Sequence, residues 1–169
     1  MNRDDHLMTI TVKKDWWKTL FDDLYLQTDA RSVCDDKLTK REVSAVIRKL
    51  NLNQDDYLLD LCGGQGRHSL ELSRRGYQNV VLLDYSTALL QHGSQIARQE
   101  KLSTAFIQGD ARYLGFSRQA FTVVLIMGCS FGYFTDENEN SRILKGVYES
   151  LQTSGRLLLD LPHRAYVSQ

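Results

Sequence analysis

The fold of this chain is decided by one short stretch, Tyr57-Leu-Leu-Asp-Leu-Cys62, which runs directly into Gly63-Gly64-Gln65-Gly66. A short apolar run of this kind predicts a β-strand buried on both faces. The glycines let the backbone turn sharply and approach a ligand closely, and the helix expected after them presents its N–H groups to that ligand. The stretch therefore predicts a ligand-binding turn, with a plain strand-to-helix turn as the alternative.

Four more apolar runs follow and alternate with segments of helical spacing. They predict strands over residues 80–84, 105–108, 121–127 and 156–161. Helices are expected from the glycine turn to Gly76, over 87–100, and through residues 144–151 to a stop at Ser154-Gly155. Strands without polar alternation, separated by helices, predict an α/β fold in which a doubly wound parallel sheet lies behind N-terminal helices.

The first third of the chain is expected to be helical. Apolar side chains recur at helical spacing in two sets, Trp17, Leu20, Phe21, Leu24 and Val43, Val46, Ile47, Leu50. The second helix should begin near residue 38. We therefore divide the chain into an N-terminal helical cap segment, 1–52, and a core domain, 53–169. Trp16 and Tyr25 flank the first set and either fold over a binding site or pack within the helical segment.

Composition and charge narrow the class of protein. Lys and Arg number 21, as do Asp and Glu, so the 169-residue chain has no net charge to coat a polyanion. The three cysteines, Cys34, Cys62 and Cys129, lack zinc spacing and are expected to be free, buried thiols in a reducing compartment. A charged N-terminus and apolar runs too short for a bilayer favour a cytoplasmic protein without a membrane segment.

Acidic residues mark the ends of the predicted strands, where open parallel sheets bind their ligands. Asp60 lies just before the glycines, Asp84 ends the second strand, Asp110 follows the third and Asp160 lies in the fifth. A carboxylate at Asp84 could accept hydrogen bonds from both hydroxyls of a ribose. The alternatives are an exposed strand-end acid or a cap for the helix that opens near Ser86.

A nicotinamide dinucleotide is one candidate ligand, and an NAD(P)-binding oxidoreductase is therefore an alternative function. Its fingerprint requires Gly or Ala at the third position of the loop, where this chain has Ser69. Asp60 would also repel a pyrophosphate. A neutral or cationic ligand suits this loop better.

Four segments in chain order resemble the motifs of class I S-adenosylmethionine-dependent methyltransferases. They are residues 58–68, 81–86, 108–111 and 127–134. The resemblance implies a Rossmann-like fold, S-adenosylmethionine as cofactor and methyl transfer as the activity. Two departures stand out: Cys62 replaces the first glycine of the family's usual loop, and Gln152-Thr-Ser-Gly155 replaces its frequent Pro-Gly-Gly turn.

The same resemblance implies a set of cofactor-binding residues. They are Asp60, Gly63, Gly64, Gly66, Asp84, Tyr85, Asp110, Ala111, Met127 and Gly128. Asp60 would anchor the loop near the methionine amino group, and Asp84 would hold the ribose diol. Asp110 would accept a hydrogen bond from the exocyclic amine of adenine, beside Ala111. Met127 and Gly128 would line the amino-acid end, and no metal is implied.

No catalytic residue stands out, because an activated methyl group makes a dedicated base optional. His163 is a weak candidate for accepting a proton from the substrate, with an ordinary loop histidine beside Pro162 as the alternative. Neutral charge and the lack of a basic, aromatic tract favour a small-molecule acceptor over nucleic acid.

A serine hydrolase is a remote alternative. Gly128-Cys-Ser130-Phe-Gly132 matches the nucleophile-elbow pattern, and Asp160 and His163 follow in hydrolase order. An elbow must run straight into a helix, whereas here a helix is expected only from about residues 135–139.

A non-catalytic nucleoside-binding module is the third alternative. The fold of the resembled family normally continues with two more strands after the fifth, and this chain is expected to lack them because it stops at Gln169. An uncovered edge strand invites pairing with other chains. The sequence therefore predicts either that the chain is a truncated or partial form of the fold, or that a second subunit of a homo-oligomer covers this edge.

Overall fold

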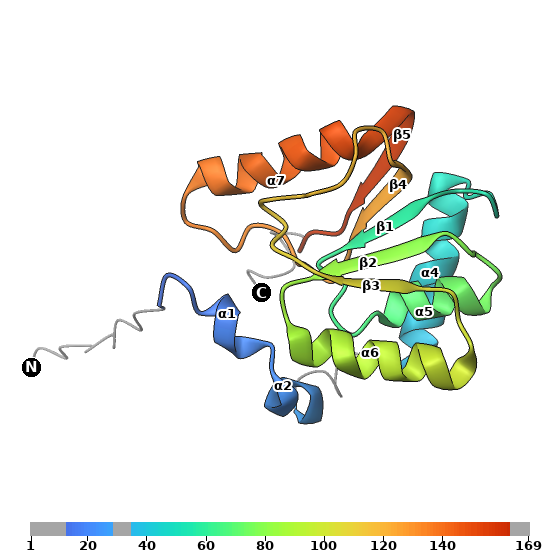
Figure 1. Ribbon diagram of the computed structural model, residues 1–169, viewed down its shortest axis with the longest axis horizontal. Helices are drawn as coiled ribbons and strands as arrows, with labels where there is room; N and C mark the ends of the chain where they lie inside the picture. Colours follow the sequence, from blue (N-terminus) through green and yellow to red (C-terminus); the bar gives the residue numbers. More distant parts are fainter. Residues whose placement is uncertain (1–12, 29–34, 163–169) are drawn as a thin grey trace, which may run out of the picture.

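The computed structural model describes residues 13–28 and 35–162. Its centre is a sheet of five parallel strands in the order β3-β2-β1-β4-β5 (Figure 1). The strands are β1 (Leu58–Leu61), β2 (Val80–Asp84), β3 (Ala105–Gln108), β4 (Phe121–Ile126) and β5 (Leu151–Leu159). This arrangement confirms the predicted doubly wound, Rossmann-like α/β sheet.

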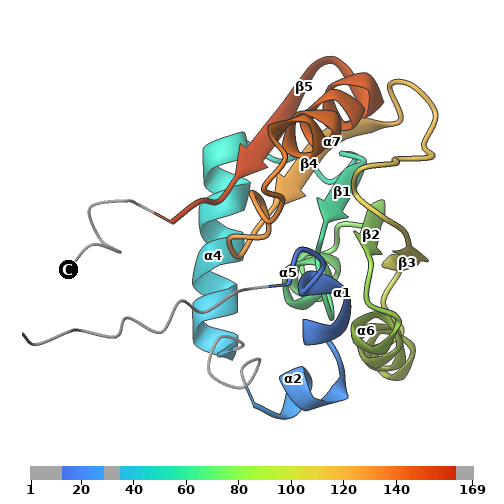
Figure 2. The ribbon, with the colours of Figure 1, turned by 90° about the vertical axis from the view of Figure 1, so that its left-hand side faces the viewer.

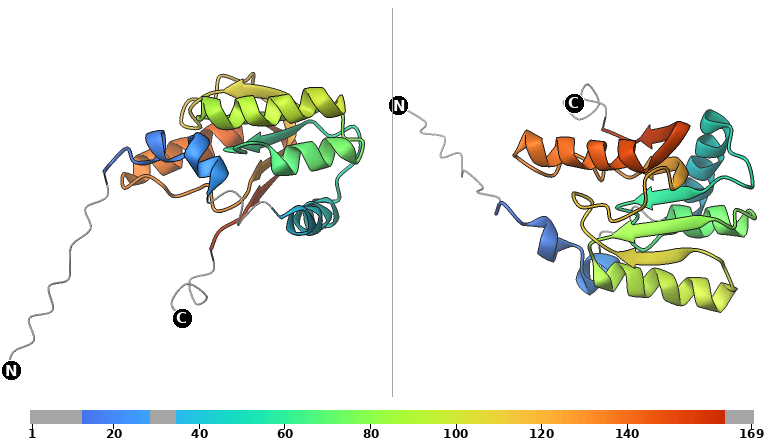
Figure 3. Two further views of the ribbon diagram at one scale, coloured as in Figure 1. Left: turned by 90° about the horizontal axis from the view of Figure 1, so that it is seen from below. Right: turned by 45° about the horizontal axis from the view of Figure 1, so that its top comes forward.

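Helices cover both faces of the sheet. They are α1 (Trp17–Leu20), α2 (Asp23–Gln27), α4 (Asp36–Leu50), α5 (Arg67–Arg74), α6 (Thr87–Glu100) and α7 (Glu137–Ser150). α4 packs on α5 and α5 on α6, while α7 packs on β5. Figure 3 shows α7 beside β5 at one end of the sheet and α6 beside β3 at the other.

The core consists of two apolar layers, one on each face of the sheet, and β1 contributes to both. Leu58 packs with Val43 and Val46 of α4, whereas Leu59 packs with Ile143 and Val147 of α7. Successive residues of a strand point to opposite faces, so a strand that is apolar at every position must be covered twice. This explains why the run before the glycines carries no exposed polar position.

The strand order reverses at β1, which pairs with β2 on one side and β4 on the other. The loops after these strands diverge there and leave a crevice at the carboxyl ends, the usual ligand site of such sheets. Helix α1 lies at the same edge, beyond the arrow tip of β1 (Figure 1). Figure 2 looks onto this edge and shows α1 in front of the strand ends.

The N-terminal helix that the spacing predicts is broken into α1 and α2. The break falls at Asp22, which has extended backbone angles and accepts hydrogen bonds from the backbone N–H groups of Leu24 and Tyr25. An aspartate that caps a new helix in this way interrupts the one before it. The expectation of one continuous helix here was wrong.

The turn before β5 also differs from the prediction. Helix α7 ends at Ser150, and β5 begins at once with Leu151, so Ser154 and Gly155 lie within the strand. The β4–β5 register shifts between Phe121 and Val123, and Ser154 takes a positive φ of 64° at that irregularity. Asp160 lies just after the strand rather than within it.

The exposure of the cysteines, of the helices and of the sheet edges bears on further predictions. Cys62 is partly buried and Cys129 is exposed, so the expectation of buried thiols was wrong for Cys129, while Cys34 lies outside the described residues. Across the described residues, no helix combines the length and apolar character needed to cross a bilayer. β3 and β5 are the edges of the sheet, and Leu157 of β5 is 38% exposed. The division at residue 52 and the covering of the β5 edge by a second subunit stay predictions.

Candidate active site

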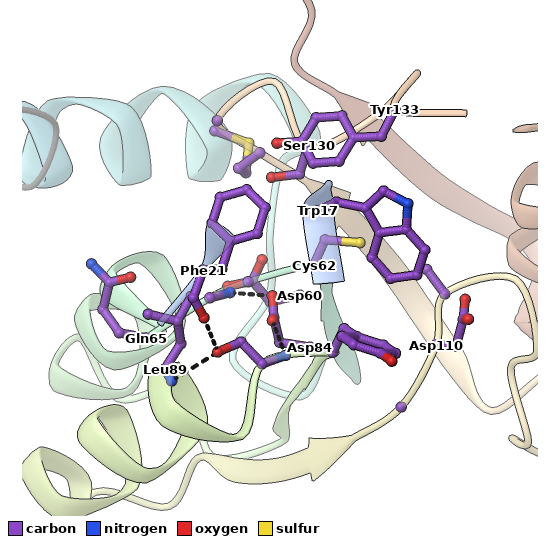
Figure 4. A pocket seen from close by; sticks show the side chains of 18 of the residues that line it. Trp17, Phe21, Asp60, Cys62, Gln65, Asp84, Leu89, Asp110, Ser130 and Tyr133 are labelled. Atoms are coloured by element: carbon purple, nitrogen blue, oxygen red, sulfur yellow. Dashed lines mark hydrogen bonds between the residues drawn. The ribbon is translucent and has the colours of Figure 1, made fainter. Parts of the chain in front are cut away.

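A pocket opens at the carboxyl ends of β1, β2 and β4, with about 1180 Å³ of empty space that is continuous with solvent. Nine of the ten residues predicted to bind a cofactor line it (Figure 4). They are Asp60, Gly63, Gly64, Asp84, Tyr85, Asp110, Ala111, Met127 and Gly128. The tenth, Gly66, lies behind the wall, closely packed on Leu82 and Phe106.

Asp60 forms the floor of the pocket beneath the glycine turn. It is 1% exposed, and its Oδ2 accepts a hydrogen bond of 2.6 Å from the hydroxyl of Ser69. Its Oδ1 is buried and has no hydrogen-bond partner within the described structure. Buried carboxylate oxygens are normally satisfied, so this oxygen is available to a donor on a ligand.

Gly63 has to be a glycine because of this floor. A Cβ at this position would lie 2.8 Å from Asp60 Cγ and 2.8 Å from Leu82 Cγ. The absence of a side chain lets the turn approach the carboxylate closely. The motif and the acid before it are therefore one structural unit.

Asp84 joins the end of β2 to the glycine turn. Its Oδ2 accepts from the backbone N–H of Gly64 and its Oδ1 from that of Ser86, both at 2.8 Å. Burial raises the pKa of the Asp84 carboxyl above its ordinary value; these two hydrogen bonds oppose the rise and the nearby Asp60 charge adds to it. Each oxygen keeps a further lone pair, so donors from a ligand would stabilise the ionised form.

The segment after β4 does not form a nucleophile elbow. Ser130 lies in a loop, and α7 begins only at Glu137, capped by Asp136. Asp160 accepts a hydrogen bond of 3.0 Å from the backbone N–H of Gly128, and His163 lies outside the described residues. The sharp strand-to-helix turn that the hydrolase alternative requires is absent from this described segment.

Arg67 and His68 follow the glycine turn, line the pocket and are both held by Glu42 of α4. Arg67 Nη1 donates to Glu42 Oε2, and His68 Nε2 lies 2.9 Å from the same oxygen. Burial would raise the pKa of Glu42, but the hydrogen bonds and charges of Arg67 and His68 lower it overall. His68 is only 4% exposed, so its ring is packed within the wall of the pocket.

Aromatic side chains form a roof over the pocket. Trp17, Phe21 and Tyr25 reach it from the N-terminal segment, and Tyr133 and Phe134 from the loop after β4. Figure 4 shows Trp17, Phe21 and Tyr133 on the side of the pocket away from Asp84. We define these five residues as the aromatic roof.

The roof is held by ring packing and by hydrogen bonds to the α/β core; one of these runs from the side-chain amide of Asn140 in α7 to the carbonyl of Phe134 at 2.9 Å. Phe21 stacks on Tyr133 with their ring planes 10° apart, and Trp17 meets Phe134 edge-on at 5.4 Å between centroids. Ser86, the N-cap of α6, donates its hydroxyl to the carbonyl of Phe21 at 2.5 Å. The segment is thereby fixed above the pocket. Of the two alternatives left open for Trp16 and Tyr25, Tyr25 lines the pocket, whereas Trp16 packs on Tyr133.

Two nucleophilic groups in the pocket remain protonated at neutral pH. Burial, with the charge of Asp84, raises the pKa of the Cys62 thiol far above its ordinary value. Burial also raises the pKa of the Tyr133 phenol. Both groups therefore present neutral surfaces to a ligand rather than an anion.

Several residues of the site could not be predicted from the sequence. Trp17, Phe21 and Glu42 carry no local motif, because their roles depend on which distant residues they meet. Gly93 could have been predicted to matter, because a glycine inside a helix is unfavourable and usually has a packing or functional role. A Cβ there would lie 2.2 Å from the carbonyl oxygen of Gln65, so Gly93 lets α6 pack against the glycine turn. Among the described residues no group of three or more His, Cys, Asp or Glu could hold a metal ion.

Comparison with known proteins places this geometry in context. A family model described as a methyltransferase domain matches residues 58–155. A demethylmenaquinone methyltransferase from Lactobacillus johnsonii is 29% identical over 114 residues, which cover 65% of this chain and 45% of that protein. A glycine/sarcosine N-methyltransferase from Halorhodospira halochloris is 27% identical over 126 residues, covering 74% of this chain and 47% of its own length.

A solved structure agrees with these matches. The SAM-dependent methyltransferase from Methanosarcina mazei superposes with a TM-score of 0.59 at 29% identity, covering 66% of this chain and 54% of that one. The chain spans less than half the length of the two curated relatives described above.

Proposed function

The chain belongs to the class I S-adenosylmethionine-dependent methyltransferase family, and from this premise we propose that it transfers a methyl group from S-adenosylmethionine to a small-molecule acceptor. One observation carries the proposal: Asp60, which lines the pocket of the glycine turn, has a buried carboxylate oxygen, Oδ1, without a partner in the described structure. An ammonium group is the donor that such an oxygen accepts best.

The remaining polar groups of the pocket suit the other parts of the cofactor. Asp84, with a free lone pair on each oxygen, would hold the two ribose hydroxyls. Tyr85, Asp110 and Ala111 would border the adenine at the neighbouring strand end. Met127 and Gly128 would line the amino-acid end, close to Asp60.

The cofactor supplies a methyl group that its sulfonium already activates. The residues of this chain would then have three tasks: to hold the donor, to place an acceptor in line with the methyl group and to exclude water. The aromatic roof supports the last task, since Phe21 and Tyr133 cover the pocket above Cys62 with apolar surface. His163 stays a candidate proton acceptor.

The acceptor is left open within the class of small molecules. The curated relatives named above act on demethylmenaquinone and on glycine or sarcosine, which share no acceptor atom. The aromatic wall favours an acceptor with an apolar body. A balanced charge of 21 basic and 21 acidic residues gives no support to a nucleic-acid acceptor.

Ligand-induced stabilisation tests the proposal. S-adenosylhomocysteine should raise the melting temperature of the full chain through linkage. Asp84→Ala should remove the shift, because it deletes the ribose acceptors and the anchor of Gly64, a loss of more than about hundredfold in affinity. Asp136→Asn, which alters only the cap of α7, is the matched control and should keep the shift. No stabilisation of the folded wild-type chain at millimolar ligand would overturn the proposal, and stabilisation by NADH instead would favour the oxidoreductase alternative.

A further inference from the structure

Arg112 lies just behind the pocket wall and joins three parts of the molecule. Its Nη2 donates to Asp110 Oδ2 at 2.6 Å and its Nε to Asp110 Oδ1 at 2.9 Å. Its Nη1 donates to Glu139 Oε2 of α7 at 2.9 Å. The side chain is 20% exposed, so these ion pairs are partly shielded from water. Such two-point contacts fix the orientation of a carboxylate as well as its charge.

The same guanidinium lies over two aromatic rings. Its carbon lies 4.7 Å from the ring centroid of Phe134 and 5.3 Å from that of Trp17. Both rings belong to the aromatic roof, and Trp17 also meets the ring of Tyr85 edge-on at 4.9 Å. Arg112 therefore contacts the acid assigned to adenine and the roof at the same end of the pocket.

We propose that Arg112 is a positioning residue that sets the nucleobase specificity of the cofactor site, by orienting Asp110 toward the adenine amine while holding Trp17 over the same end of the pocket. This inference rests on the proposed function, because it takes S-adenosylmethionine as the ligand.

The chemistry of Asp110 supports this role. Burial would raise the pKa of its carboxyl, but hydrogen bonds from the Arg112 side chain and backbone lower it overall. Asp110 is then an acceptor only. Adenine presents an amine at its exocyclic position, which donates to such a group, whereas hypoxanthine presents a carbonyl oxygen, which the carboxylate repels. Discrimination between the two bases depends on the carboxylate being held in place.

Lysine cannot replace Arg112 in this arrangement. An ammonium group is a compact charge without a planar fork of N–H donors, so it cannot pair with both oxygens of Asp110 in the same geometry and also contact both rings. Arg112→Lys keeps the positive charge but loses the two-point contact with Asp110, whereas Arg112→Met loses both the charge and the contact. Arg142 provides a matched control, because it also ion-pairs with Glu139, at 3.7 Å, and lies over the ring of Tyr113 at 5.3 Å.

The test is calorimetric titration of the full chain with S-adenosylhomocysteine and with S-inosylhomocysteine, its hypoxanthine analogue. Wild type and Arg142→Met should both prefer the adenine ligand. Arg112→Lys and Arg112→Met should bind it about tenfold or more weakly, as expected for the loss of one hydrogen bond to a charged group, and should lose most of the preference. A double-mutant cycle should show that Asp110→Asn adds little to Arg112→Met.

The outcomes separate the two proposals. If wild type prefers the adenine ligand and both Arg112 variants, folded by circular dichroism, keep that preference, the inference is overturned while the proposed function stands. Strict additivity of the Asp110 and Arg112 substitutions would also overturn it. If wild type binds neither ligand, the proposed function fails and the inference fails with it.

Discussion

The floor and the roof of the pocket are built in different ways. The floor consists of Asp60, Asp84 and the glycine turn, which backbone N–H groups and the buried hydroxyl of Ser69 hold in place. The roof consists of aromatic side chains that pack on one another, while Ser86 and Asn140 of the α/β core donate hydrogen bonds to the backbone carbonyls of Phe21 and Phe134. The floor leaves little room for change, whereas the roof can adapt through side-chain packing.

This difference indicates that the floor serves the methyl donor and the roof serves the acceptor. A donor that is the same in every turnover suits a floor of fixed polar groups. An acceptor that differs between relatives suits a roof whose contacts are apolar and are supplied by loops and short helices. The expected effects of substitution should follow this division, with the floor the more sensitive part.

Gly63→Ala should have the largest effect on ligand affinity of three substitutions that probe this contrast. The new Cβ would lie 2.8 Å from Asp60 Cγ, so either the turn or the carboxylate must move. We expect a loss of about 1–3 kcal/mol in stability from overpacking and about tenfold to hundredfold in affinity for S-adenosylhomocysteine. Urea unfolding and calorimetry measure the two quantities.

Gly115→Ala is the control for this substitution, because no heavy atom lies within 4 Å of a Cβ at that position. It should change neither quantity. Equal behaviour of the two alanine variants would show that the floor is not tightly packed, and the contrast with the roof would be lost.

Trp17→Leu should have an intermediate effect on affinity and a small one on stability. Trp17 is 8% exposed and contacts Tyr85 and Phe134, but its helix adds little to the core of the sheet. Aromatic pairs contribute about 0.5–1.5 kcal/mol beyond burial, so we expect a loss of affinity of about threefold to tenfold. Leu20→Ala, on the same helix and 44% exposed, should bind as wild type does. A loss of affinity as large as that of Gly63→Ala would show that the roof is as constrained as the floor.

Glu42→Gln should affect affinity least and stability in a pH-dependent way. The folded-state pKa of Glu42 lies below its ordinary value of 4.5, so its contribution is present above that pH and is lost as the pH falls through the lowered pKa. We expect the variant to be about 1–3 kcal/mol less stable than wild type at pH 7, with the gap closing toward pH 3. Urea unfolding at the two pH values measures this gap. Glu149→Gln, at an exposed pair with Arg118, should show no gap at either pH. A gap that stays constant with pH would mean that the Glu42 charge does not stabilise the fold.

Much of the fold could be predicted from the sequence, and each wrong prediction of an element has a local cause. The central strands could be predicted because a strand covered on both faces is apolar at nearly every position, with Asp60 as the buried exception in β1. Gly76 ends α5 as expected, with a positive φ of 94°. The break at Asp22 was missed because an aspartate can serve as a cap or as a surface residue, and only packing decides which. The position of Ser154 was missed because a turn-like pair can also form an irregularity inside an edge strand.

The sequence predicts the part of the candidate site that one continuous segment forms. It does not predict the parts that form where distant segments meet. Asp60 and Gly63 lie in one motif, so their spacing alone indicated a site. Glu42 lies 26 positions before His68, and nothing in either segment indicates that they pair. Arg112 likewise acquires its contacts with Trp17 and Glu139 only through the packing of the N-terminal segment and α7.

Local sequence pattern is enough to specify the floor of the pocket: a buried strand, a glycine turn and acids at neighbouring strand ends, because parallel strands bring their carboxyl ends to one edge. The roof, the partner of each charge and the unpaired oxygen of Asp60 arise only when distant segments pack together. Pairing between side chains that are far apart in the sequence depends on how helices and loops pack, and local sequence patterns do not predict that packing.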